Sequence, residues 1–548
     1  MDGNLNYREE DEANYSYLFI PDNTGRKAVY FDMYKKPMKK VQFESAWEMR
    51  EYAKTSSITH ESDVPLIYKF ILDNFSDTEK DAPCNTAFYD IEVDFDLDDG
   101  RGYPSIHDPF GVINGVSLFD ANNQRYIMLC LTAANINLVD KDFPVDVYRF
   151  LSETELLRTF VDLLEEHDID LITGWNTAQF DLNYIMERLI INFGEKKAKT
   201  MLCRNGHSAT KRSFTNEYGE DTWEWEIKGR IHLDMMLLYK KFKPKGLESY
   251  SLDSVCQKEL KISKLEYDGN LGELYRENPQ KFFEYSLHDS RLLYLLNKKL
   301  NIINIALVFS RDNCVLASDV TGTVKPIEQS FIKFCRRKGN IVLPDKVSKD
   351  KLDFRGAVVY NTICGLIKKS FSIDLTSLYP STMIMLGLSL ENLVFQLKGE
   401  DIDFYKVIQR TKELVTIIIE ETKEEFELPA FEVHDIIKEN GYCISAAGTV
   451  FDGNMGLIAE YIKEGFDLRT KFKQEEKKAS IAGDKDVAIK FNLLQNSKKL
   501  LNNSTYGAIA NPHFRLFDIR LARSITYTGA MVSKHMNYRT NETIRAVA

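Results

Sequence analysis

The sequence lacks the patterns that mark membrane and secreted proteins. No apolar run is long enough to span a bilayer. The opening, MDGNLNYREEDE, is acidic, whereas a secretory signal is basic and then apolar. The eight cysteines are scattered singly without a C-x-x-C pair, so no zinc site or disulfide framework is indicated. We therefore expect a cytoplasmic protein with buried free thiols and no membrane partner.

Basic residues are outnumbered by acidic ones overall, and the formal net charge is -11. Taken alone, this value argues against a partner as acidic as nucleic acid. Residues 461–548 nevertheless contain sixteen Lys and Arg against eight Asp and Glu. A basic end on an acidic chain permits phosphate binding by one face, and a solvated helix with uneven charge is the alternative.

At 548 residues the chain exceeds the size of a single hydrophobic core, so several domains are expected. Short apolar segments alternate with helical patterns, which predicts a multidomain α/β and α+β fold. Residues 205–218 are polar and rich in turn formers, and they predict a protruding hairpin. A charged helical stretch from Leu457 to Ser504 is interrupted near Gly483, which predicts a helix pair.

Two acids on one apolar strand give the first indication of chemistry. Asp90 and Glu92 lie two residues apart in the segment Phe88 to Val93, so both side chains face the same side of the strand. Buried carboxylates on one face repel each other unless cations lie between them. Two Mg²⁺ ions about 3.5–4 Å apart can hold both reacting oxygens of a phosphodiester. The pattern favours metal-dependent phosphodiester chemistry, with purely structural acids as the alternative.

Further residues extend this pattern. Asp181 opens a helical segment shortly after the Gly-Trp-Asn sequence at 174–176, and Tyr285 and Asp289 lie four residues apart on one helical face. Together with the strand acids, the set resembles the three exonuclease motifs of DEDDy proofreading nucleases, and those of family B DNA polymerases in particular. The resemblance implies that Tyr285 positions the attacking water and that two divalent ions, Mg²⁺ or Mn²⁺, are held by Asp90, Glu92, Asp181 and Asp289.

A second motif lies in the segment 372–381. Asp374 ends an apolar strand that turns into a helix, where backbone N–H groups suit a triphosphate. The segment resembles the D-x-x-S-L-Y-P-S motif of family B polymerases. The resemblance implies that Asp374 is a catalytic metal ligand, with Leu375 beside the same metal, and that Tyr379 excludes a 2'-hydroxyl. The triphosphate of the dNTP substrate would then be bound by Leu375, Thr376, Ser377 and Leu378.

The basic end contains a third motif. Lys499 and Asn503 lie four residues apart on one helical face, in a segment similar to the K-x-x-x-N-S-x-Y-G motif of the polymerase fingers. The resemblance implies that these two residues meet the triphosphate and that Tyr506 and Gly507 abut the nascent base pair. A second phosphate-binding face would comprise Arg469 and Lys473, although Lys473 could equally be a solvated lysine. Arg355, Gly356 and Ala357 resemble a segment that links the two functions along the template.

One family motif is missing from residues 1–548. Family B enzymes place a D-T-D-S strand, a primer-binding segment and a thumb after the fingers, and no D-T-D occurs in this sequence. With one metal-bridging carboxylate in place of two, the chain should not polymerise alone. The resemblance, best to polymerases of large tailed, T-even-like phages, therefore implies the N-terminal portion of a split or truncated enzyme. The expected domains are an N-terminal domain (1–86, with 303–355 returning to it), an RNase H-like 3'-5' exonuclease domain (87–302), a first part of the palm (356–456), helical fingers (457–511) and a continuation of the palm (512–548).

Three readings of function remain open. The first is one subunit of a split polymerase that binds primer-template DNA and single-stranded DNA, with a second polypeptide that supplies D-T-D-S and meets a sliding clamp. The second is a stand-alone 3'-5' exonuclease in which the polymerase remnant only binds DNA. The third is a non-catalytic module of the replication complex. A complete nucleotide pocket favours the first reading, because a DNA-binding platform has no need of one.

Overall fold

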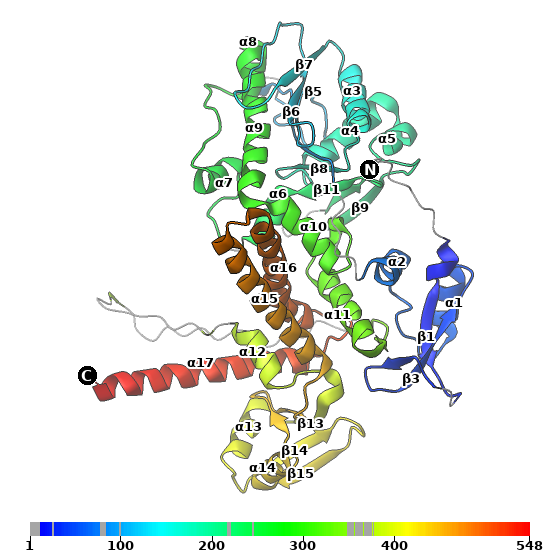
Figure 1. The fold of residues 1–548 in the computed structure, drawn as a ribbon, viewed down its shortest axis with the longest axis vertical. Helices are drawn as coiled ribbons and strands as arrows, with labels where there is room; N and C mark the ends of the chain where they lie inside the picture. The colour runs from blue at the N-terminus through cyan, green and yellow to red at the C-terminus, as the bar shows by residue number, and fades with distance from the viewer. Residues whose placement is uncertain are drawn as a thin grey trace. The chain divides into compact units, whose positions relative to one another are not determined.

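The computed structural model describes residues 11–24, 27–76, 84–97, 100–215, 221–243, 246–347, 356, 365–366, 375 and 377–547. The chain divides into two compact units, one formed by Met1–Thr78 with Val308–Ala548 and the other by Glu79–Leu307 (Figure 1). Helices and several sheets occur in both units, so the mixed, multidomain fold class expected from the sequence is confirmed.

The second unit, Glu79–Leu307, is a mixed sheet covered by helices. Its elements are β4 Thr86–Val93, β5 Ile113–Asp120, β6 Arg125–Leu131, β7 Val145–Phe150, α3 Glu153–Glu166, β8 Leu171–Gly174, α4 Asp181–Phe193, α5 Glu195–Met201, β9 Thr210–Thr215, β10 Asp221–Glu226, β11 Ile231–Asp234, α6 Met235–Phe242, α7 Leu252–Glu259, α8 Leu271–Glu277 and α9 Pro279–Leu300, with α10 Ile302–Asp312 at its boundary. Six strands form the sheet in the order β11-β8-β4-β5-β6-β7.

The two faces of strand β4 have different neighbours. Tyr89 and Ile91 belong to the apolar core that α3 and α4 form against the sheet. Phe88 points to the other face, where its ring lies 6.3 Å from that of Tyr294 on α9. Because side chains alternate along a strand, Asp90 and Glu92 share the face of Phe88 and meet α9. The long α9 runs beside the sheet in Figure 1.

The first unit, Met1–Thr78 with Val308–Ala548, contains two sheets and a set of long helices. Its elements are η1 Glu12–Tyr15, β1 Tyr17–Pro21, β2 Tyr30–Asp32, β3 Pro37–Gln42, α1 Ala46–Thr55, α2 Leu66–Phe75, η3 Ala317–Asp319, α11 Val324–Gly339, β12 Ile341–Val342, α12 Leu378–Met385, η4 Leu390–Asn392, β13 Leu393–Leu397, α13 Glu400–Ile408, β14 Leu414–Ile419, β15 Glu425–Pro429, α14 Ala430–Glu439, β16 Cys443–Ile444, β17 Thr449–Phe451, α15 Leu457–Ala482, α16 Lys485–Ile509 and α17 Ile519–Val547. The sheets have the strand orders β1-β3-β2-β12 and β15-β14-β13-β17-β16.

The helix pair expected from the sequence is confirmed as α15 and α16, which lie side by side (Figure 1). Gly483 ends α15 in the left-handed conformation with φ of 77°, which suits a residue without Cβ. The side chain of Asp484 accepts a hydrogen bond from the Val487 N–H and starts α16. The Phe472 and Phe491 rings, 6.1 Å apart, join the two helices.

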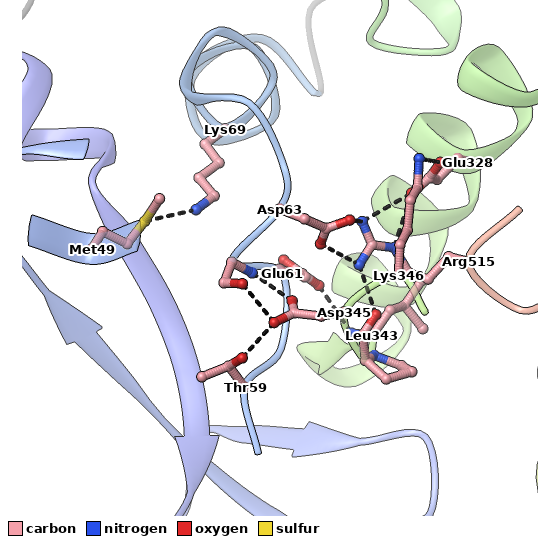
Figure 2. Close-up of polar contacts among 12 residues, drawn as sticks. Met49, Thr59, Glu61, Asp63, Lys69, Glu328, Leu343, Asp345, Lys346 and Arg515 are labelled. Carbon is pink, nitrogen blue, oxygen red and sulfur yellow. Dashed lines mark hydrogen bonds and ion pairs between the residues drawn. The ribbon is translucent and has the colours of Figure 1, made fainter. Parts of the chain in front are cut away.

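A buried polar network fastens distant segments of the first unit together (Figure 2). Arg515, in the connection between α16 and α17, donates to both carboxylate oxygens of Asp63 at 2.7 and 3.0 Å. Its Nε donates to Glu328 of α11 at 2.9 Å, and its Nη1 donates to the carbonyl of Pro344 at 2.6 Å. Asp345, beside Pro344, accepts from the N–H of Ser62 at 2.6 Å. One guanidinium thus joins three segments that are far apart in the sequence, around Asp63, Glu328 and Pro344.

The cysteines and the apolar helices bear on two expectations from composition. Five of the seven described cysteines are buried, whereas Cys84 and Cys443 are only half-buried. Cys364 lies outside the described residues. Over the described parts of the chain, no single helix is long and apolar enough to cross a membrane, and only the bent pair α9 with α10 passes on length and composition when taken together.

Candidate active sites

Strand β4 and helix α9 bring three of the predicted acids together. Carboxylate oxygens of Asp90, Glu92 and Asp289 lie within 4.8 Å of one another. Glu92 and Asp289 are buried, with 8% and 2% of their surface exposed. The alternation along β4 accounts for the first two acids, and the position of α9 over that face of the sheet supplies the third.

Lys264 supplies a cation that the sequence did not point to. Its Nζ lies 2.5 Å from Oδ2 of Asp289 and donates to the hydroxyl of Tyr285 at 3.0 Å. Tyr285 and Asp289, four residues apart on α9, therefore share this ammonium group. The ring of Tyr267 packs edge-on against that of Tyr285, with 5.2 Å between the ring centroids. Lys264 stands in a segment without a recognisable motif, so no local signal would have singled it out.

Asp181 lies beside the cluster but outside the set of three. It is the first residue of α4 and is buried, and its Oδ1 accepts a hydrogen bond from the Ile91 N–H at 3.2 Å. The turn before it is held by Asp234, whose carboxylate accepts from the N–H groups of Asn176 and Ala178. The backbone of β4 and the Asp234 carboxylate thus fix where Asp181 sits.

Burial dominates the electrostatics of this cluster. It raises the pKa of Asp90 well above its ordinary value, and the neighbouring charges of Asp181, Glu92 and Asp289 add to the rise. Burial and the charge of Asp289 raise the pKa of Glu92 to about 8. Burial raises the pKa of Asp181 to about 7, although backbone hydrogen bonds oppose it. Burial also raises the pKa of Asp289 despite the opposing charge of Lys264. Among the described residues, four acids therefore share one nearby cation, Lys264, and the cluster as a whole keeps an excess of acidic groups.

The donor set fits a hard divalent cation. Carboxylate oxygens are the ligands that Mg²⁺ and Mn²⁺ prefer, and three of them converge here. Oδ1 of Asp289 is buried and has no hydrogen-bond partner among the described residues. Burial of a carboxylate oxygen without a partner costs free energy of folding, so this atom is well placed to serve as a metal ligand.

The second predicted site is described only in part. Asp374 and Thr376 lie outside the described residues, as do Arg355 and Ala357. Leu375 is half-buried, and Ser377 adopts the left-handed conformation with φ of 54° just before α12. The turn into a helix expected after the strand is therefore present at Leu378.

The fingers motif meets α12 through two tyrosines. The rings of Tyr379 and Tyr506 lie 4.5 Å apart at 43°. Burial and the neighbouring Tyr379 raise the pKa of Tyr506 to about 12. Lys499, Asn503 and Gly507 are exposed on the same helix, α16.

The two residues predicted to form a second phosphate-binding face lie on α15. Lys473 is exposed there, while Arg469 is half-buried. The Nε of Arg469 is enclosed without a hydrogen-bond partner among the described residues. The structure therefore brings Tyr379 and Tyr506 into contact, and it places the four basic and amide side chains of the motif on the paired helices α15 and α16.

The hairpin expected from residues 205–218 is formed by β9 and β10, which pair from Thr210 with Glu226 to Thr215 with Asp221. Lys211 of β9 contacts both the other strand of the hairpin and helix α4. Its ammonium lies 3.7 Å from the centroid of the Trp223 ring and 3.1 Å from Glu187 on α4. The cation–π contact thus lies within the hairpin, and the ion pair with Glu187 joins the hairpin to α4.

Family models match two stretches of the chain. Residues 50–255 match the family described as DNA polymerase family B, exonuclease domain, and residues 320–546 match the family described as DNA polymerase family B. The DNA-directed DNA polymerase of Escherichia phage RB69 is 24% identical over an alignment of 600 positions, which covers 98% of this chain and 64% of that protein. The DNA-directed DNA polymerase of Enterobacteria phage T4 is 27% identical over 507 residues, which cover 83% of this chain and 54% of that protein.

A eukaryotic relative shows a similar likeness. The DNA polymerase delta catalytic subunit of Glycine max is 24% identical over 475 residues, which cover 83% of this chain and 39% of that protein. The chain thus spans between about two fifths and two thirds of the length of these relatives. Both family matches, together with the acid cluster on β4 and α9, show that the chain belongs to family B of the DNA polymerases and carries that family's exonuclease domain.

Proposed function

We propose that the unit Glu79–Leu307 hydrolyses DNA from its 3' end as a proofreading exonuclease. The convergence of Asp90, Glu92 and Asp289 around a buried, unpartnered carboxylate oxygen carries this proposal. These three acids and Asp181 would hold two divalent ions, which activate water and stabilise the charge that develops on the phosphate. Tyr285 would position the attacking water, and Lys264 would orient both Tyr285 and Asp289 through its contacts at 3.0 and 2.5 Å.

The test is digestion of single-stranded DNA labelled at its 5' end, with Mg²⁺ or Mn²⁺ present. The double variant Asp90→Ala/Glu92→Ala should lose activity, because both strand ligands are gone. A matched control is Asp162→Ala/Glu166→Ala, which removes two exposed acids of α3 that lie four residues apart. Digestion by the strand variant at the parental rate would contradict the assignment.

We also propose that the unit with α12, α15 and α16 forms the nucleotide side of a DNA-directed DNA polymerase site. Tyr379 would exclude a 2'-hydroxyl, and Tyr506 and Gly507 would abut the new base pair. The contact between the Tyr379 and Tyr506 rings supports a common pocket. Phosphates of the dNTP would meet the backbone at 375–378 and the side chains of Arg469, Lys473, Lys499 and Asn503, with Asp374 as the metal ligand. The duplex partner would be primer-template DNA.

Nucleotide addition would further need a D-T-D-S segment, which we propose comes from a second polypeptide. Residues 1–548 contain no D-T-D, and phosphoryl transfer by one metal-bridging carboxylate would lack half of the charge stabilisation. Tyr538 and Ile544 of α17 are 61% and 41% exposed, which leaves apolar surface for such a segment to cover. A sliding clamp reached through that second chain stays a prediction.

Primer extension distinguishes the split polymerase from the exonuclease-only reading. The chain alone should not extend a primer, whereas a mixture with the D-T-D-S polypeptide should, and Asp374→Asn should abolish extension by the mixture. Robust template-directed synthesis by the chain alone would refute the need for a second polypeptide. A mixture that digests single strands but never extends a primer would favour the stand-alone exonuclease. A mixture without either activity would favour a non-catalytic module.

A further inference from the structure

A glycine lies inside the longest helix of the described residues, against the ring of Tyr379. Gly529 belongs to the 29-residue helix α17, although glycine is a poor helix former. A Cβ built at this position would lie 3.4 Å from Cε1 and 3.5 Å from Cδ1 of Tyr379, and 3.5 Å from Cδ2 of Leu378. These are ordinary van der Waals distances. The space beside the tyrosine ring therefore has room for one methyl group that the sequence does not supply.

The structure around this space is held firmly. Thr528, next to Gly529, accepts a buried hydrogen bond from the Ala446 N–H at 3.0 Å. Ser524, one turn earlier, donates to the hydroxyl of Ser445 at 2.9 Å, also in a buried position. These bonds pin α17 to the loop between β16 and β17, so its backbone cannot easily shift. On another side, the Tyr379 ring meets Tyr506 at 4.5 Å.

We propose that Gly529 is a specificity-determining residue that sets how far the Tyr379 ring can withdraw from the sugar of an incoming nucleotide. The inference rests on the proposed role of Tyr379 in excluding ribonucleotides. A pocket rejects an added hydroxyl group only weakly when the side chain that would clash with it can move aside. Close-packed neighbours prevent such movement. With glycine at 529, a space of about one methyl group remains beside the Tyr379 ring, and the ring can move into it. A methyl group at 529 fills that space and restricts the movement of the ring.

The test compares wild-type protein with Gly529→Ala, each in complex with the D-T-D-S polypeptide proposed above. Measured values are kcat/KM for a dNTP and for the matching rNTP opposite the same template base. Alanine favours the helix, so loss of folding is not expected. We expect the ratio of dNTP to rNTP efficiency to rise about fivefold, because ribonucleotides need the ring to move. In a Tyr379→Ala background, where no ring remains, Gly529→Ala should leave the ratio as it is in Tyr379→Ala.

A matched control is Asn537→Ala, an exposed change two turns later in α17 that also favours the helix. It should not change the ratio. The inference is overturned if Gly529→Ala keeps the wild-type ratio while the wild-type complex extends with dNTPs, or if it lowers both efficiencies equally. The same change of ratio in the Tyr379→Ala background would also overturn it. A wild-type complex that adds no dNTP would instead overturn the proposed polymerase function, and this inference with it.

Discussion

Replacement of Arg515 by Met should destabilise the first unit by about 3–4 kcal/mol. The guanidinium is 1% exposed and bonds to Asp63, Glu328 and the carbonyl of Pro344. Removal of one partner from a buried ion pair costs about 3–5 kcal/mol, because the other charge stays buried without compensation. The lower part of this range is expected, since Asp63 is 28% exposed and Glu328 keeps an ion pair with Lys346 at 2.7 Å.

Hydrogen exchange gives the cleanest measurement, because a chain with two units need not unfold in one step. The amides of Ser62 and Leu343 donate to Asp345 and Glu61 within the network, at 2.6 and 3.0 Å. Their opening free energy should fall by the stated amount in Arg515→Met. Addition of Glu328→Gln to that variant should recover part of the loss, because it neutralises the carboxylate left behind.

The matched control is Arg539→Met, which breaks an exposed pair with Glu542 on α17 whose side chains are 68% and 44% exposed. It should change the opening free energy of the Ser62 and Leu343 amides by less than about 0.5 kcal/mol. If Arg515→Met lowers that energy no more than Arg539→Met does, the network does not hold these segments together, and the reasoning is wrong.

Two predictions concern the exonuclease site. Lys264→Met should slow digestion about 10–100-fold, mainly in kcat, because Tyr285 and Asp289 lose the group that orients them. Lys261→Met, an exposed change nearby, should have no effect, and equal rates for both variants would exclude a role for Lys264. The second prediction concerns pH. Without metal, the raised pKa values of Asp181 and Glu92, from 3.8 to about 7 and from 4.5 to about 8, mean that the folded protein retains protons that the unfolded chain releases. Their contribution to stability is therefore greatest below about pH 4 and declines as pH rises toward 8. Since metal binding requires deprotonated ligands, Mg²⁺ should raise the melting temperature more at pH 8 than at pH 6. A shift independent of pH, or one equally large in Asp90→Ala/Glu92→Ala, would contradict this account.

Local periodicity in the sequence was enough for several features. Alternation along β4 places Asp90 and Glu92 on one face whatever the rest of the chain does, because the period of a strand is fixed by its backbone. The end of α15 at Gly483 likewise depends on that residue's own conformational freedom. The motif spacing on α16 follows from the helical repeat. These features are short-range, so the sequence alone determined them.

Only the tertiary structure decided which distant groups meet. The pairing of Lys264 with Asp289, the links from Arg515 to Asp63 and Glu328, and the approach of Gly529 to Tyr379 join segments that no local pattern relates. The tertiary structure also brings Asp181 beside the three clustered acids of β4 and α9, where the backbone N–H of Ile91 on β4 donates to its carboxylate. Such contacts depend on how helices and sheets pack, and packing is set by the shapes of many side chains together.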